Sequence, residues 1–336
     1  MRTARPNRTR TARGLALGGA AAAALAVGLV GATTANAAGS AVVLDGVLIV
    51  VGSDAADRIA LRLAADPAFL EVDLGDDGTA EAVVDRALFD RIDVAMLNGA
   101  DAFRVDQSRG AFADEALTVD GGAGDDRLDG GDGVEHFIGG NGRDAVDGNR
   151  GDDSAQLGTG GDSFRWDPGD GSDLVEGGSG DDVLDFNGAG ANETMQLVPE
   201  GERAVFLRDV ANIRMDMDGV ERLDLSALGG ADRVTVADMT GTDMRKALID
   251  LTLAGGDDGQ TDIVTVQGTP AADAVEVDDR AGRIDVKGLQ VTTQITGAQP
   301  ADQLVVRTEG GADSVLTDPA VEALVDLTID LGAGQP

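Results

Sequence analysis

The sequence predicts an all-β fold in which short parallel strands stack into a thin, coiled structure. Three observations lead to this prediction. A nine-residue unit recurs seven times between Gly121 and Asp185, runs of alternating apolar residues recur on both sides of that block, and aromatic residues make up only 3% of the chain. Because there is no Tyr and one Trp, the core must consist mainly of Val, Leu, Ile and Ala, which suits a narrow coil.

The first 37 residues predict a secretory signal peptide. Five arginines lie among the first 13 residues, an apolar run extends from Leu15 to Val30, and Ala35-Asn36-Ala37 is a small-residue cleavage signal. The apolar run is short and rich in Gly and Ala, so an uncleaved membrane anchor is the less favoured alternative. No adjacent arginine pair is present, which favours the general secretory route. We expect a secreted mature chain without a membrane span.

The composition favours a cation as partner and excludes several other classes. The formal net charge is −35, from 61 acidic and 26 basic residues. Such a chain repels nucleic acid and anionic membranes and attracts multivalent cations. Cysteine is absent, which excludes disulfides and a thiol nucleophile. We therefore expect no nucleic-acid partner.

On both sides of the block, Asp is followed by alternating apolar residues. Period-two alternation after a Gly, Ala or Asp turn predicts short strands. Their recurrence favours degenerate solenoid repeats over residues 38–118 and 187–336, with a separate β-sandwich on either side as the alternative. The examples are residues 57–61, 232–236, 273–277, 302–306 and 313–316.

Three further segments carry weaker predictions. Residues 73–78 lie between two strand-like runs and lack the Glu at the twelfth position of an EF-hand loop, so we expect a hairpin turn there. Residues 216–219 also predict a turn. Residues 242–250 are a weak helix candidate.

The block, residues 119–186, follows one pattern. Position four of the unit is Gly and position eight is apolar in all seven units. Glycine permits a tight turn with positive φ, and one apolar side chain points inward from a three-residue strand. A disordered Gly/Asp-rich linker, the alternative, does not explain the apolar eighth position. Position six is acidic throughout: Asp126, Glu135, Asp144, Asp153, Asp162, Asp173 and Asp182.

This block resembles the RTX (hemolysin-type) calcium-binding repeat GGxGxDxUx, which forms a parallel β-roll. Two units then make one coil of roughly 18 residues, with turns alternating between two edges. The resemblance implies that several Ca²⁺ ions bind between stacked turns, and that turn carbonyls complete the coordination. The carbonyls in question belong to Gly122, Gly124, Gly140 and Gly142. The flanks look similar to the degenerate β-repeats that accompany RTX segments in secreted calcium-binding proteins.

The acidic residues are expected to form two columns. Asp126, Asp144, Asp162 and Asp182 fall on one edge, and Glu135, Asp153 and Asp173 on the other. Stacked carboxylates repel one another without a cation, and calcium accepts six to eight oxygen ligands in flexible geometry. The two-residue insertion Trp166-Asp167 makes the register of the pairs Asp153/Asp173 and Asp162/Asp182 less secure. Glu135 departs from the repeat by one methylene.

These features favour a calcium-binding β-roll, folded and stabilised by extracellular Ca²⁺, without its own catalysis. The single histidine, His136, excludes an H-E-x-x-H zinc site, and no G-x-S-x-G elbow is present. A calcium-dependent adhesin or matrix-interaction module that binds cell-surface or matrix polymers is the alternative. A calcium-assisted polysaccharide-active enzyme is less favoured, because only Lys246 and Lys287 are lysines.

Overall fold

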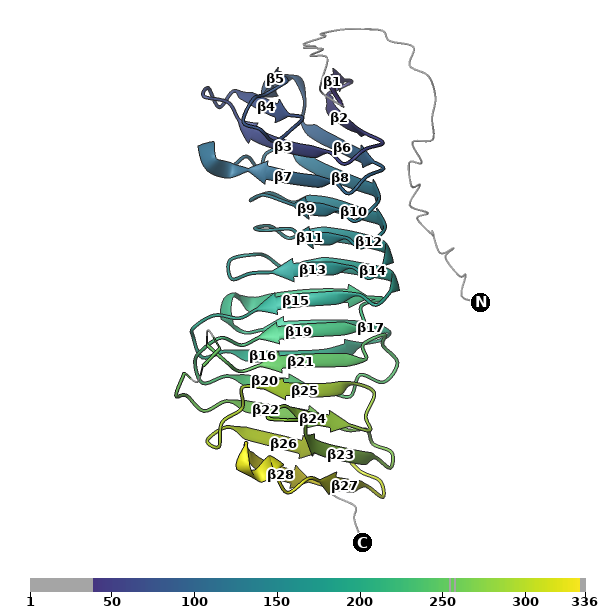
Figure 1. Ribbon diagram of the computed structural model, residues 1–336, viewed down its shortest axis with the longest axis vertical. Helices are drawn as coiled ribbons and strands as arrows, with labels where there is room; N and C mark the ends of the chain where they lie inside the picture. The colour runs from purple at the N-terminus through teal and green to yellow at the C-terminus, as the bar shows by residue number, and fades with distance from the viewer. Residues whose placement is uncertain (1–38, 254, 257, 333–336) are drawn as a thin grey trace, which may run out of the picture.

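The computed structural model describes residues 39–253, 255–256 and 258–332 (Figure 1). The expected signal peptide, residues 1–37, lies outside the described residues. The described chain confirms the all-β prediction. Two 14-stranded, mostly parallel sheets form one elongated stack that runs from β1 to β28. Among the described residues, no helix is long and apolar enough to cross a membrane.

The strands of the two sheets alternate along most of the chain. In spatial order the first sheet contains β1 (Ser40–Leu44), β2 (Val47–Ser53), β6 (Arg91–Leu97), β8 (Ala116–Ala123), β10 (Glu135–Asn141), β12 (Ser154–Gly160), β14 (Leu174–Gly180), β18 (Ile213–Asp218), β17 (Arg203–Arg208), β16 (Thr194–Glu200), β20 (Arg233–Val236), β22 (Ile263–Gln267), β26 (Gln303–Arg307) and β28 (Asp326–Asp330). The second contains β27 (Ser314–Thr317), β23 (Ala274–Asp279), β24 (Ile284–Lys287), β25 (Thr292–Thr296), β21 (Lys246–Asp250), β19 (Arg222–Ser226), β15 (Val183–Asn187), β13 (Ser163–Trp166), β11 (Ala145–Asp147), β9 (Arg127–Asp129), β7 (Ala102–Asp106), β3 (Arg58–Leu63), β4 (Phe69–Asp73) and β5 (Ala82–Asp85). Short 3₁₀ turns lie at Arg86–Leu88, Gln107–Arg109, Val210–Asn212 and Val321–Ala323.

Two nine-residue units make one coil, as the repeat predicts. Phe137 in β10 lies opposite Ala155 in β12, and Val146 in β11 lies opposite Phe164 in β13, so equivalent residues are two units apart. Strand side chains alternate between the two faces of a sheet, which places position eight inside and its neighbours outside. All seven position-eight side chains are buried in the core between the sheets: Leu128, Phe137, Val146, Ala155, Phe164, Val175 and Leu184.

The Trp166-Asp167 insertion lengthens one coil without breaking the stack. Trp166 has no exposed surface, and its ring stacks on Phe186 with a centroid separation of 4.1 Å. The Arg208 guanidinium lies 5.2 Å from the Trp166 ring, and the indole Nε1 donates to the Gly171 carbonyl at 2.8 Å. The insertion therefore adds a large aromatic side chain to the core and provides its polar atom with a partner.

The flanks continue the same two sheets rather than forming separate β-sandwiches. Antiparallel excursions interrupt the parallel order. In the first sheet β16, β17 and β18 form a meander, and its outer strands pair in parallel with β20 and β14. In the second sheet β23, β24 and β25 form another, and β3, β4 and β5 lie at the N-terminal end (Figure 1).

Of the three weaker predictions, one is confirmed and two are wrong. Residues 73–78 form the turn between antiparallel β4 and β5, where the Asp73 carboxylate accepts the Gly78 N–H. Of residues 216–219, the first three lie in β18 because they pair with β14 and β17, and the chain bends only at Gly219, where φ is 62°. Residues 246–250 form β21 instead of a helix, since their alternation buries every second side chain in the core.

Replacing Trp166 by Ala should destabilise the protein by about 3–5 kcal/mol, because it leaves a large cavity in a thin core. Denaturant unfolding followed by far-UV circular dichroism measures this loss. Val134→Ala, at a side chain that is 64% exposed, is the matched control and should change stability by less than about 0.5 kcal/mol. Equal stability of the two variants would contradict the packing described here.

Candidate metal centre

Four aspartates form a hydrogen-bonded ladder along one edge of the stack, here called the first column. Each carboxylate accepts the backbone N–H of the equivalent residue one coil earlier. The Asp126 N–H donates to Asp144 Oδ1 at 2.9 Å, and the Asp144 N–H donates to Asp162 Oδ1 at 2.8 Å. The Asp162 N–H donates to Asp182 Oδ1 at 2.8 Å. The stacking expected from the repeat is present.

The second column, on the opposite edge, has the same construction. The Glu135 N–H donates to Asp153 Oδ1 at 2.7 Å, and the Asp153 N–H donates to Asp173 Oδ1 at 2.8 Å. The insertion therefore preserves the stacking on both edges. Glu135 differs in that its longer side chain reaches back to its own turn, where Oε2 accepts the Gly131 N–H at 3.1 Å.

The seven carboxylates are buried, and most carry an oxygen without a partner. Asp144, for example, has no exposed surface. A buried acceptor without a hydrogen bond costs about 1–3 kcal/mol, so native proteins rarely leave one unpaired. None of the seven forms an ion pair with a Lys or Arg of the described chain. The Oδ2 atoms that are buried without a hydrogen-bond partner belong to Asp126, Asp144, Asp153, Asp162 and Asp182.

Burial raises the pKa values of these groups. The pKa of Asp144 rises to about 7 and that of Asp153 to about 8, mainly because burial disfavours the charged form. The adjoining carboxylates add to the effect, while the hydrogen bond from the backbone N–H opposes it. The pKa values of Glu135 and Asp173 also rise to about 7 through burial. The pKa of Asp182 rises to about 6, and those of Asp126 and Asp162 are also raised, in each case mainly by burial.

The glycines bring the turn backbones into direct contact. Gly142 has φ of 137°, and a Cβ there would lie 1.9 Å from the Gly124 carbonyl oxygen. A Cβ at Gly140, where φ is 112°, would lie 2.0 Å from the Gly122 carbonyl oxygen. The carbonyls of Gly122 and Gly124 thus face the next coil, beside the carboxylate column.

The available donor atoms are oxygens, which suits a hard cation. In the described part of the chain, no group of three or more His, Cys, Asp or Glu side chains is arranged to hold a metal ion. A cation between two stacked turns would therefore need backbone carbonyls in addition to the two carboxylates. His136 does not contribute, because it lies in β10 with Nδ1 at 2.9 Å from Ser154 Oγ.

Several carboxylates at equivalent positions outside the block have protein partners for their second oxygen, whereas Oδ2 of Asp101, Asp232 and Asp313 has none. Asp57 Oδ2 accepts both the backbone N–H and the hydroxyl of Ser53. Glu193 pairs with Arg208, and both side chains are buried. Asp302 Oδ2 accepts the Gln299 N–H at 2.7 Å. The chain thus neutralises or hydrogen-bonds these flanking carboxylates but leaves five carboxylates of the block without such partners.

Sequence reasoning missed that the first column extends in both directions. The Asp101 N–H donates to Asp126 Oδ1 at 2.8 Å, and the Asp182 N–H donates to Glu221 Oε2 at 2.8 Å. The signal for Asp101 was present, since Gly99, Asp101 and Phe103 occupy positions four, six and eight of a degenerate unit. The same signal marks Glu221, since Gly219, Glu221 and Leu223 occupy positions four, six and eight of a degenerate unit. Glu221 reaches the column only after the β16–β18 meander, so its place beside Asp182 depends on tertiary structure.

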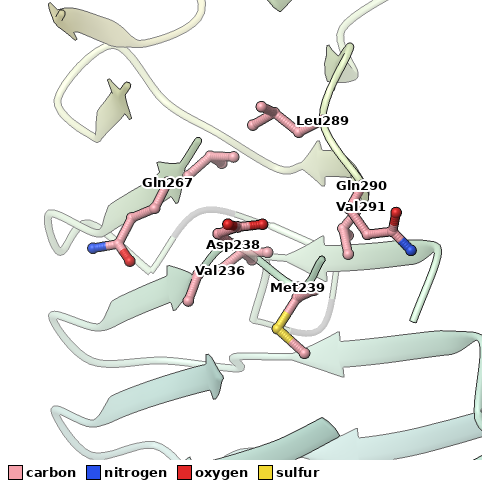
Figure 2. Close-up of a pocket in the computed structure, with 9 residues that line it drawn as sticks. Val236, Asp238, Met239, Gln267, Leu289, Gln290 and Val291 are labelled. Atoms are coloured by element: carbon pink, nitrogen blue, oxygen red, sulfur yellow. The ribbon is translucent and has the colours of Figure 1, made fainter. Parts of the chain in front are cut away.

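A small hollow outside the columns does not suit a substrate. It lies near Val236, Asp238, Met239 and the loop residues Leu289 and Val291 (Figure 2). Its volume is about 10 Å³, which is room for no more than one water molecule.

Comparisons with known proteins identify no relative. No protein-family model matches the chain, and no curated protein matches it. The function proposed below therefore rests on the residues and geometry of this chain alone.

Gly142→Ala should destabilise the protein by more than about 2 kcal/mol, because it combines an unfavourable φ with a steric clash against the Gly124 carbonyl. Gly190→Ala is the control, since a Cβ there has no atom within 4 Å. Thermal unfolding with saturating calcium would measure both. Equal melting temperatures would show that the turns are not in close contact.

The metal-free protein should lose stability as the pH rises. The folded-state pKa values of Asp144 and Asp153 lie above the ordinary value near 4. The folded state therefore binds protons more tightly than the unfolded chain, and the stability that this contributes is fully present below about pH 4. It is lost as the pH rises through about 7 and 8, the folded-state values. The melting temperature of dialysed, metal-free protein should fall between pH 5 and pH 8, and Asp144→Asn with Asp153→Asn should flatten this slope. A melting temperature that rises with pH in the metal-free protein would contradict the burial of Asp144 and Asp153.

Proposed function

We propose that this protein is a secreted calcium-binding β-roll of the RTX type, whose folding and stability depend on extracellular Ca²⁺. One observation carries the proposal. Five buried carboxylates of the block have an oxygen without a hydrogen-bond partner, whereas some flanking carboxylates at equivalent positions, Asp57 and Glu193 among them, are paired with Ser53 and Arg208. A cation between the turns provides the missing partner.

Calcium fits these turns better than other common cations. Zinc prefers nitrogen and sulfur ligands, and the chain has no Cys and one His. Magnesium requires near-ideal octahedral geometry at about 2.0–2.1 Å. Calcium takes six to eight oxygens at about 2.3–2.6 Å in flexible geometry, including backbone carbonyls. In the pair Asp126/Asp144, the carboxylates and the carbonyls of Gly122, Gly124, Gly140 and Gly142 would supply such a set.

The energetics support metal-coupled folding. Two ionised carboxylates about 5 Å apart repel by about 3 kcal/mol at an effective dielectric constant near 20, and each column repeats this contact. The metal-free columns must therefore either hold protons or lose packing above neutral pH. At about 2 mM calcium and a Kd near 0.1 mM, each occupied site would add about 1.8 kcal/mol to stability. Several sites together equal the whole stability of an ordinary domain.

The location follows the same logic. Cytosolic calcium is too dilute to fill sites of this affinity, while extracellular calcium is not. The chain would stay loosely folded until export, and calcium outside the cell would complete the roll. We assign it a structural, calcium-dependent role without catalysis.

Asp144→Asn should reduce the number of calcium ions bound, because Asp144 lies between Asp126 and Asp162 and serves both gaps. Asn keeps the Oδ1 acceptor but removes the charge. Calorimetric titration of the mature chain, with magnesium as the competing ion, would count the sites. Far-UV circular dichroism should show a cooperative gain of β signal in the unsubstituted protein.

Asp273→Asn is the matched control, because both Asp273 carboxylate oxygens already accept hydrogen bonds from Thr269. It should retain the full number of ions. An equal loss in the two variants would contradict the column assignment. A chain that is fully folded without metal and gives no heat on titration would refute the proposed function.

A further inference from the structure

Two turns outside the block share an uncommon backbone conformation with the block. Position two of the unit has positive φ in most block turns, at Gly122, Gly140, Gly158 and Gly178, and at Asn149 in the opposite edge. In the flanks the same position is left-handed at Leu97, with φ of 79°, and at Leu228, with φ of 69°. This conformation is unfavourable for leucine because its Cβ crowds the following carbonyl oxygen.

The stacked glycine of position four is also kept in these two turns. Gly99 and Gly230 have φ of 150° and 122°. A Cβ at Gly124 would lie 1.3 Å from the Gly99 carbonyl oxygen, and a Cβ at Gly230 would lie 2.5 Å from the Ala191 carbonyl oxygen. The turn backbones therefore lie in contact with the neighbouring coil, as in the block.

The acidic residue of each turn is buried with one oxygen unpaired. Asp101 is 2% exposed and Asp232 is 1% exposed, and the Oδ2 atom of each has no hydrogen-bond partner. Their Oδ1 atoms continue the ladder. Asp101 Oδ1 accepts the Asp57 N–H at 2.7 Å, and Asp232 Oδ1 accepts the Glu193 N–H at 2.8 Å.

The remaining flank turns lack this combination. Asp57 and Asp302 occupy the same ladder positions, but their Oδ2 atoms accept hydrogen bonds from Ser53 and Gln299. Position two of these turns is Ser53 and Ala298, and neither has positive φ. The turns of Asp101 and Asp232 therefore combine a left-handed position two with an unpaired buried carboxylate oxygen, with Leu97 and Leu228 in place of the glycine of the repeat. Asp313 Oδ2 is also unpaired, but position two of its turn, Glu309, does not have positive φ.

We propose that residues 96–101 and 227–232 are two further calcium-binding turns. Their sequences lack the glycine at position two that is typical of the block. This inference rests on the proposed function. One ion would lie between Asp101 and Asp126, extending the first column by one coil. The other would lie between Asp232 and Asp262, whose Oδ1 accepts the Asp232 N–H at 2.9 Å. Calcium binding would then extend well beyond the nonapeptide block, into both flanks.

The test counts bound calcium by equilibrium dialysis of the mature chain at saturating calcium. Asp101→Asn and Asp232→Asn should each bind one ion fewer than the unsubstituted protein, and the double variant two fewer. Asp57→Asn and Asp302→Asn are the matched controls and should bind the full number. Far-UV circular dichroism in calcium establishes that each variant is folded.

The outcomes separate this inference from the proposed function. If Asp144→Asn loses calcium while Asp101→Asn and Asp232→Asn match their controls, the off-motif turns are refuted and the β-roll stands. If the unsubstituted chain binds no calcium, the proposed function itself fails.

A second pair of variants avoids removing the carboxylate. Leu97→Gly and Leu228→Gly should keep all ions and tighten the binding of one ion about five-fold, because glycine adopts the left-handed conformation without strain. Unchanged or weaker binding would count against the two turns.

Discussion

The hydrogen bond between a buried turn carboxylate and the backbone N–H of the preceding coil is the interaction on which the rest of the structure depends. It joins successive coils at both edges and fixes their register. In the first column it runs without interruption from Asp57 to Glu221. Each such carboxylate uses one oxygen for the ladder and leaves the other to be satisfied separately.

The chain satisfies the second oxygen in two ways. In parts of the flanks it uses protein groups, such as the Ser53 hydroxyl or the Arg208 guanidinium. For five carboxylates of the block it supplies no such group, and glycine backbones occupy the space where a larger residue would have to sit. A carboxylate whose second oxygen is paired with a protein group needs no further partner. A buried carboxylate without such a group requires a cation or a proton. This difference, rather than a difference in fold, separates the block from most of the flanks.

Because the core is narrow, the hydrogen-bonded turns at the two edges contribute much of the stability. Each block strand contributes one or two apolar side chains, so the sheets alone bury little surface per coil. The ladder and the ions proposed for it therefore supply much of the stability that a thicker domain obtains from its core. Trp166 and Phe186 strengthen the core locally where the insertion allows a larger side chain.

The sequence by itself determined the strands of the block, the coil length and the two carboxylate columns, because those depend on local glycine conformations and on a nine-residue period. Only the tertiary structure decided the β16–β18 meander, since strand order depends on long-range pairing that leaves no local pattern. It also decided that the first column extends to Asp101 and Glu221, and that Asp232 belongs to a separate ladder in the C-terminal flank. In the turns of Asp101 and Asp232 the glycine of position four is kept, as Gly99 and Gly230, but leucine replaces the glycine of position two and still adopts positive φ. The sequence gives no local sign of that conformation, because leucine rarely adopts it.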